Sequence, residues 1–183
     1  MTDSLLWMAS NVGPATNGMK DSQCPSAQMP PYWYYEIEPT ELENRVDLSS
    51  DQCVIDSEYY FVRGFLNIPI IDGVGPFVWG VWVSLSADNF LRMSEMWESP
   101  TRQTEPPYFG WLSTTLPGYP DTLNLKTNVH TQPVGTRPLI ELEPTDHPLA
   151  IDQRTGITME RAQRLAECAL HGETEPIGGS EGG

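Results

Sequence analysis

Apolar and polar residues alternate with a period of two along two neighbouring stretches, residues 59–71 and 77–85. The apolar positions of the two stretches are Tyr60, Val62, Leu66, Ile68, Ile70, Phe77, Trp79, Val81, Val83 and Leu85. Residues 72–76 between them read Asp-Gly-Val-Gly-Pro, a composition typical of turns. The pattern therefore predicts a β-hairpin with one buried face. Gly64 interrupts the apolar row of the first strand, and we expect another segment of the chain to approach closely there.

Three further strands are expected, over residues 109–114, 123–131 and 137–143. In the second of these the apolar side, which consists of Leu123, Leu125, Thr127 and Val129, is predicted to face inward. The other side carries Asn124, Lys126, Asn128 and His130. These four polar side chains follow one another at steps of about 6.6 Å on one face of the sheet.

Two helices are predicted. Ser86 is a good N-cap for a helix over residues 87–97, with Asp88 in its first turn. Thr158 caps a last helix, which ends before Gly172 and has one apolar stripe formed by Ala162, Leu165, Ala166, Ala169 and Leu170. The order of these elements predicts an α+β fold, a single domain in which an antiparallel β-sheet carries two main helices packed on it.

The ends of the chain lack the periodicity of its middle. Residues 1–28 are interpreted as a loosely ordered leader, and residues 172–183 as a flexible Gly-rich tail. The folded domain is accordingly expected over residues 29–171.

Charge and cysteine content restrict the function classes. The 183 residues include 25 acids and ten bases, for a net charge of −15, and between Glu36 and Glu58 the only base among eight acids is Arg45. Such a surface repels nucleic acids and suits a basic protein partner, although it is equally typical of a solvated exterior. Three widely spaced cysteines without a secretory signal or a membrane-length apolar segment indicate a cytoplasmic protein that binds no membrane.

The sequence contains several candidate chemical sites, but none of them matches a complete catalytic motif. The polar row can bind an extended ligand or a partner, or it can be an ordinary solvent-facing strand. Asp146 can orient His147 for proton transfer, or it can cap a turn through the backbone. The residue types of a metal site are also present, in His130, His147 and a carboxylate, either Glu141 or Asp146. Nothing in the spacing of these residues brings them together. Neither a metal nor a cofactor is predicted.

Aromatic residues are concentrated in two segments, residues 33–35 and 108–111. Tyr108, Phe109 and Trp111 follow a Pro-Pro pair and can form a recognition patch together with Trp33, Tyr34 and Tyr35. The same residues can equally belong to the core.

Several blocks of residues resemble those of one bacterial family. They include Trp79-Gly80-Val81-Trp82, Pro106-Pro107-Tyr108-Phe109-Gly110-Trp111, Leu116-Pro117-Gly118-Tyr119-Pro120 and Asp146-His147-Pro148-Leu149-Ala150. The family is domain of unknown function 2199, and the resemblance covers about residues 30–171. It implies membership but no activity. Many members of the family begin with a C-x-x-C segment that resembles a metal knuckle. The leader of this chain has only Cys24, so the resemblance implies no zinc site here.

The leading hypothesis is a non-enzymatic, acidic, cytoplasmic protein-interaction module, with a toxin-neutralising immunity protein as one form. Its binding residues are expected among Asn124, Lys126, Asn128, His130, Tyr108 and Trp111. The alternative is a small-molecule-binding domain or an enzyme with a polar cleft formed by Lys126, His130, Asp146 and His147. A third hypothesis is a regulatory or scaffold role for the acidic segment, residues 36–58. The sequence does not determine the oligomeric state.

Overall fold

The computed structural model describes residues 30–171. The leader and tail predicted from the sequence lie outside these residues.

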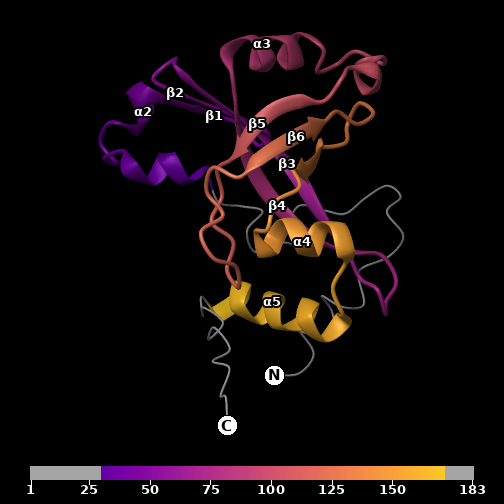
Figure 1. The fold of residues 1–183 in the computed structure, drawn as a ribbon. Helices are drawn as coiled ribbons and strands as arrows, with labels where there is room; N and C mark the ends of the chain where they lie inside the picture. The colour runs from indigo at the N-terminus through magenta and orange to yellow at the C-terminus, as the bar shows by residue number, and fades with distance from the viewer. Residues whose placement is uncertain (1–29, 172–183) are drawn as a thin grey trace.

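Five strands form a closed barrel (Figure 1). They are β3 (Tyr59–Pro69), β4 (Pro76–Leu85), β5 (Tyr108–Leu112), β6 (Lys126–His130) and β7 (Leu139–Leu142). Each pairs antiparallel with the next, and β7 then pairs in parallel with β3 at Phe65 and Leu139, which closes the circle. Two extra strands, β1 (Val46–Leu48) and β2 (Gln52–Ile55), extend the sheet from β3.

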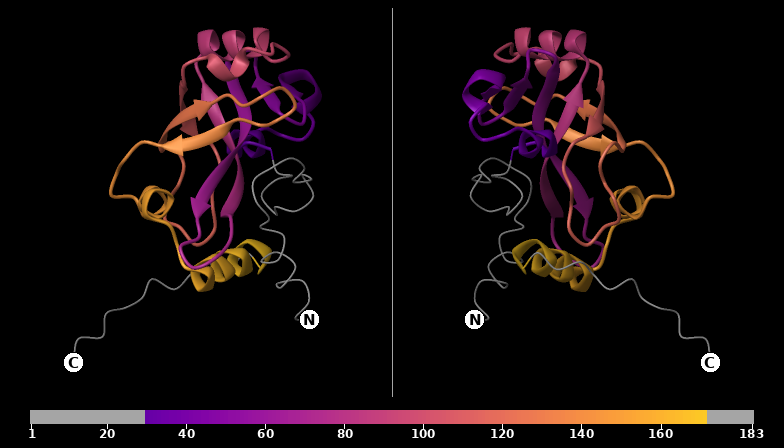
Figure 2. Two further views of the ribbon diagram at one scale, coloured as in Figure 1. Left: turned by 90° about the vertical axis from the view of Figure 1, so that its right-hand side faces the viewer. Right: turned by 90° about the vertical axis from the view of Figure 1, so that its left-hand side faces the viewer.

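Three helices lie at the ends of the barrel. Helix α3 (Ala87–Glu95) lies at one end, and α4 (Pro148–Thr155) and α5 (Met159–His171) lie towards the other (Figures 1 and 2). Shorter helical turns are η3 (Tyr32–Glu36), α2 (Leu42–Arg45) and η4 (Arg102–Thr104). Among the residues described, no helix is long and apolar enough to cross a membrane.

The predicted antiparallel sheet with two helices packed on it is therefore wrong. The individual strands were recognised because their alternation is local, but the parallel contact between β3 and β7 joins residues 65 and 139 and has no local signal. Helix α4 was missed because residues 142–150 were interpreted as a strand end and loop. The correct architecture is a mixed five-stranded barrel with two extra strands and three helices.

The predicted apolar rows do face the barrel interior. Val62, Leu66, Trp79, Val81 and Val83 are each at most 1 % exposed and belong to one large core. Side chains of all three helices join this core at the barrel ends; they are Phe90, Met93, Leu149, Ala150, Ala162 and Leu165.

A second, smaller core covers the outside of β2, β3 and β4. It contains Cys53, Phe61 and Trp82 together with Ile37, which follows η3 in the chain. Outer positions of these strands are thus buried by the segment around η3 and α2.

The contact that closes the barrel depends on Gly64. A Cβ atom at this position would lie 2.6 Å from Ile140 Cδ1 and 2.8 Å from the backbone oxygen of Pro138. The amide of Phe65 donates a hydrogen bond of 2.9 Å to that same oxygen. The expected close approach at Gly64 is confirmed, and the approaching segment is β7 with the residues just before it.

Side chains that accept hydrogen bonds from the first free amides determine where α3 and α5 begin. Ser86 Oγ accepts a hydrogen bond from the Asn89 amide at the start of α3, as predicted. At the start of α5, Thr158 Oγ1 accepts from the Arg161 amide, and Asp72 Oδ1, from the β3–β4 turn, accepts from the Met159 amide at 2.6 Å. The Asp72 contact also fixes the β3–β4 turn against α5.

Candidate functional site

The polar row predicted on β6 is present over three of its four residues. Lys126, Asn128 and His130 alternate on the outer face of β6, while Thr127 and Val129 between them are fully buried. Asn124 lies in a turn before the strand, with a positive φ of 60°, and its amide donates to the Leu112 carbonyl. The strand begins at Lys126 rather than Leu123, so Asn124 is outside the row.

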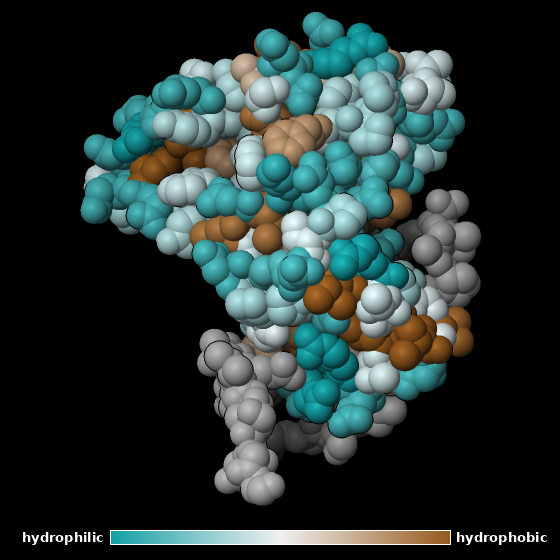
Figure 3. Space-filling model, viewed as in Figure 1, coloured by the Kyte–Doolittle hydropathy of each residue, from teal (hydrophilic) through white to brown (hydrophobic). Residues whose placement is uncertain are grey.

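Two aromatic side chains of β5 lie beside this row. Phe109 pairs with Asn128 and Trp111 pairs with Lys126 in the β5–β6 register. The two rings are 40 % and 39 % exposed and contact each other edge to face, with their centroids 5.2 Å apart. Over β5 and β6 the molecular surface is mostly hydrophilic, with an isolated apolar side chain in it (Figure 3).

Tyr108 does not belong to this surface, because alternate residues of a strand point to opposite faces. It is 6 % exposed and lies in the main core, where its hydroxyl donates to Glu105 Oε2 at 2.9 Å. Burial and this contact with a carboxylate raise the pKa of Tyr108 to about 12. We call the surface formed by Phe109, Trp111, Lys126, Asn128 and His130, with Glu141 and Glu143 beside them, the β5–β7 face.

Polar side chains of the β5–β7 face contact carboxylates of the neighbouring chain segment. His130 Nε2 lies 2.7 Å from Glu141 Oε2. Lys126 Nζ lies 4.0 Å from Glu143 Oε2 and 6.0 Å from the centre of the Trp111 ring. The face therefore combines two exposed aromatic rings with one lysine, one histidine and two carboxylates, and its aromatic rings are the residues that suit a protein contact.

The acidic segment, residues 36–58, is preceded in the chain by the aromatic turn η3 and packs on the outside of β2, β3 and β4. Turn η3 is joined to the end of β5 by a hydrogen bond of 2.9 Å from the Tyr32 amide to the Ser113 carbonyl. Trp33 and Tyr35 of η3 are 45 % and 54 % exposed. Within the segment, Arg45 binds Asp56 through two nitrogen atoms and Glu41 through a third.

His147 has a structural role at the start of α4. Its Nδ1 accepts a hydrogen bond from the Leu149 amide, and its Nε2 lies 3.1 Å from the Asp121 carbonyl oxygen. A ring that accepts at Nδ1 and donates at Nε2 is the neutral imidazole with both nitrogens engaged. The predicted capping in this loop is thus performed by the histidine itself, while Asp146 is exposed.

Lys126, His130, Asp146 and His147 do not converge on one cleft. The Glu143 amide binds the Lys126 carbonyl, so residues 146 and 147 lie beyond the Lys126 end of β6. His130 is at the other end of β6, four residues from Lys126, which corresponds to about 14 Å at a rise of about 3.4 Å per residue. The part of the chain that the structure describes also contains no group of His, Cys, Asp and Glu residues placed to hold a metal ion.

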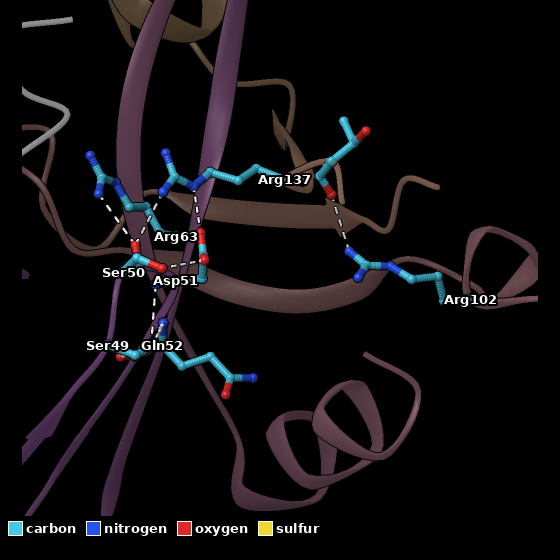
Figure 4. Close-up of polar contacts among 8 residues, drawn as sticks. Ser49, Ser50, Asp51, Gln52, Arg63, Arg102 and Arg137 are labelled. Atoms are coloured by element: carbon cyan, nitrogen blue, oxygen red, sulfur yellow. Dashed lines mark hydrogen bonds and ion pairs between the residues drawn. The ribbon is translucent and has the colours of Figure 1, made fainter. Parts of the chain in front are cut away.

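A group of buried arginines was not predicted as a site. Arg63 and Arg137 both reach the Ser50 carbonyl, and Arg137 Nε binds Asp51 Oδ1 at 2.5 Å (Figure 4). Burial opposes ionisation of Asp51, but hydrogen bonds from Ser50 and Arg137 and the two guanidinium charges outweigh it and lower the pKa of Asp51. The parallel register of β3 and β7 places residues 63 and 137 side by side, which no local pattern reveals.

Arg102 lies apart from this pair and is only 2 % exposed. Its terminal nitrogens donate to the carbonyl oxygens of Trp97 and Thr136, and its guanidinium stacks on the Trp97 ring at 4.6 Å. Burial lowers the pKa of Arg102. The side chain joins the loop after α3 to the loop between β6 and β7, a structural role for a buried charge.

Two cysteines are described, Cys53 and Cys168, and both are buried. Burial raises the pKa of Cys53 to about 12, so this thiol is not a nucleophile at neutral pH. Both side chains pack inside the protein.

Comparison with known proteins gives a family without an activity. No curated protein and no solved structure matches the chain. Residues 16–157 match the family described as "Uncharacterized protein conserved in bacteria (DUF2199)". This range contains the whole β-barrel and the β5–β7 face, and the chain belongs to this bacterial family of uncharacterized proteins.

Proposed function

We propose that this protein is a non-enzymatic, cytoplasmic interaction module that binds a basic protein partner through the β5–β7 face. The observation that carries the proposal is the pair of exposed rings, Phe109 and Trp111, on a paired strand of the barrel. Exposed aromatic side chains on rigid elements are efficient anchors, because they bury a large area and lose little conformational freedom on binding.

The charge of the chain supports a basic partner. A net charge of −15 attracts cationic surfaces over a distance of about 10 Å and raises the rate of encounter with them. The exposed acids of residues 36–58 contribute to this field.

A toxin-neutralising immunity protein is the specific form that we propose. Many toxins that act on nucleic acids need basic surfaces to bind phosphate, and an acidic protein with aromatic anchors can cover such a surface. Protection of a growing culture against a toxin encoded by a neighbouring gene tests this form. Unimpaired toxicity in cells that contain the protein contradicts it.

The interaction itself is tested by affinity capture from the bacterium that encodes the protein. Three tagged forms are compared: wild type, Phe109→Ser/Trp111→Ser, and the control Leu91→Ser. Leu91 is 57 % exposed on α3 and is not one of the residues that form the β5–β7 face, so the control also removes an exposed apolar side chain.

We expect wild type and the control to retain the same partner. The double variant should retain at least about tenfold less, the loss typical of removing two central aromatic anchors. Retention should also fall as salt is raised. Equal retention by all three forms contradicts the proposal.

A further inference from the structure

The cation nearest to the exposed aromatic pair is held loosely. Lys126 is the direct cross-strand neighbour of Trp111, and its ammonium group lies 6.0 Å from the ring centre. Its nearest carboxylate oxygen, Glu143 Oε2, is 4.0 Å away, and the Lys126 side chain remains 53 % exposed. An exposed cation–π contact and an exposed ion pair of this length each contribute at most about 1 kcal/mol, so Lys126 can leave at little cost.

The surroundings of Trp111 are suited to a cation rather than to an anion. Tryptophan has the most favourable ring face for a cation, and a guanidinium group binds such a face more often than an ammonium group does. Glu143 lies at the same end of the face, and Glu141, with a side chain that is 63 % exposed, lies further along β7. An acidic ligand would meet these carboxylates and the charge of the whole chain.

We propose that the Trp111 ring and Glu143 bind an arginine side chain of the partner, and that Lys126 occupies this position in the free protein and is displaced on binding. The inference rests on the proposed function and names the chemistry of the partner at the β5–β7 face. A second copy of this chain is disfavoured as the occupant, because two chains of −15 repel each other.

The probe is a hexa-arginine peptide, with hexa-glutamate as its control, added to the full-length protein at low salt. Binding is followed by the NMR signal of the Trp111 indole N–H, which is identified by its absence in Trp111→Phe. We expect a saturable shift of this signal with hexa-arginine and none with hexa-glutamate.

Three variants separate displacement of Lys126 from general attraction between opposite charges. Lys126→Met removes the competing cation and should tighten hexa-arginine binding about three- to tenfold. Glu143→Gln should weaken it by a similar factor. Glu95→Gln on the exposed side of α3 changes the net charge by the same amount as Glu143→Gln and should leave binding at Trp111 within about twofold.

Equal or weaker binding by Lys126→Met overturns the inference, as does a Trp111 signal that does not respond to the peptide. These results differ from those that contradict the proposed function. If capture of the natural partner still depends on Phe109 and Trp111 while Lys126→Met weakens it, the interaction module stands, and the partner presents an acid to Lys126 instead of an arginine.

Discussion

Replacing Gly64 by alanine tests the contact that closes the barrel. The backbone at this position is an ordinary part of β3, so alanine causes no conformational strain of its own. Its Cβ, however, would lie 2.6 Å from Ile140 Cδ1 and 2.8 Å from the Pro138 carbonyl oxygen. The Ile140 side chain can rotate, but the Pro138 carbonyl belongs to the backbone and can move only if β7 moves away from β3.

The expected loss of stability follows from three contributions. Overpacking of this kind costs about 1–3 kcal/mol. Weakening the hydrogen bond from the Phe65 amide to the Pro138 oxygen costs about 1 kcal/mol. The smaller conformational entropy of alanine in the unfolded chain returns about 0.5–1 kcal/mol. Gly64→Ala should therefore lower the free energy of unfolding by about 2 kcal/mol.

Urea unfolding followed by tryptophan fluorescence measures this change, and a double-mutant cycle with Ile140→Val locates it. Valine lacks the Cδ1 atom that comes closest to the new methyl group. Ile140→Val alone should cost about 1 kcal/mol, whereas in the Gly64→Ala background it should cost nothing or restore stability. A Gly64→Ala protein within about 0.5 kcal/mol of wild type, or additive effects in the cycle, would refute closure of the barrel at this residue.

Three further predictions concern other contacts. Because the pKa of Asp51 lies below its ordinary value of 3.8, its stabilising contribution is complete above that pH and is lost as the pH falls through the lower folded value. Asp51→Asn should therefore flatten the acid side of a plot of unfolding free energy against pH, and an unchanged acid side contradicts this. Asp72→Ala removes the acceptor for the Met159 amide and should cost about 1 kcal/mol in urea unfolding, with faster amide exchange in the first turn of α5; protected amides there would show that Thr158 suffices. Arg102→Met should be at least about 1.5 kcal/mol more stable than Arg102→Ala in the same assay, because methionine fills the space without a buried charge; equal losses would mean that the hydrogen bonds to the carbonyls dominate.

Local patterns predicted the parts of the fold that local physics determines. The period-two rows of β3 and β4 correctly assigned the inward residues, because one face of each strand is buried in the barrel. Ser86 and Thr158 correctly marked the starts of α3 and α5, because a hydroxyl that satisfies a free amide acts over only three residues.

Long-range contacts could not be predicted in the same way. The parallel pairing of β3 with β7 involves Phe65 and Leu139, and no sequence pattern around either residue indicates that the two are paired. Helix α4 begins with His147 as its cap and Pro148 as its first residue, and this pair was interpreted as part of a loop at the end of a strand. The fold class was therefore wrong, although most of the strands were expected.

The β5–β7 face was partly predictable. Alternation alone correctly placed Lys126, Asn128 and His130 on one face. The same rule separates Tyr108 from Trp111, because residues three apart in a strand point to opposite faces, but it was not applied to β5. Asn124 was included because the alternation continues through it, but the positive φ there ends the strand before the pattern ends. The binding role of these residues stays a prediction.

The position of β3 between three other strands has a consequence for synthesis of the protein. Strands β2 and β4 are close to β3 in the sequence and are synthesised soon before and after it. Strand β7, which pairs with β3 at Phe65, begins only at Leu139 and is synthesised much later. At about 5–20 residues per second, the ribosome needs on the order of ten seconds to pass from residue 65 to residue 139. During that time the nascent chain has an open hydrogen-bonding edge on β3, which can pair with other chains. Ribosome-bound chains that end before residue 139 should therefore depend on chaperones more strongly than the released protein does.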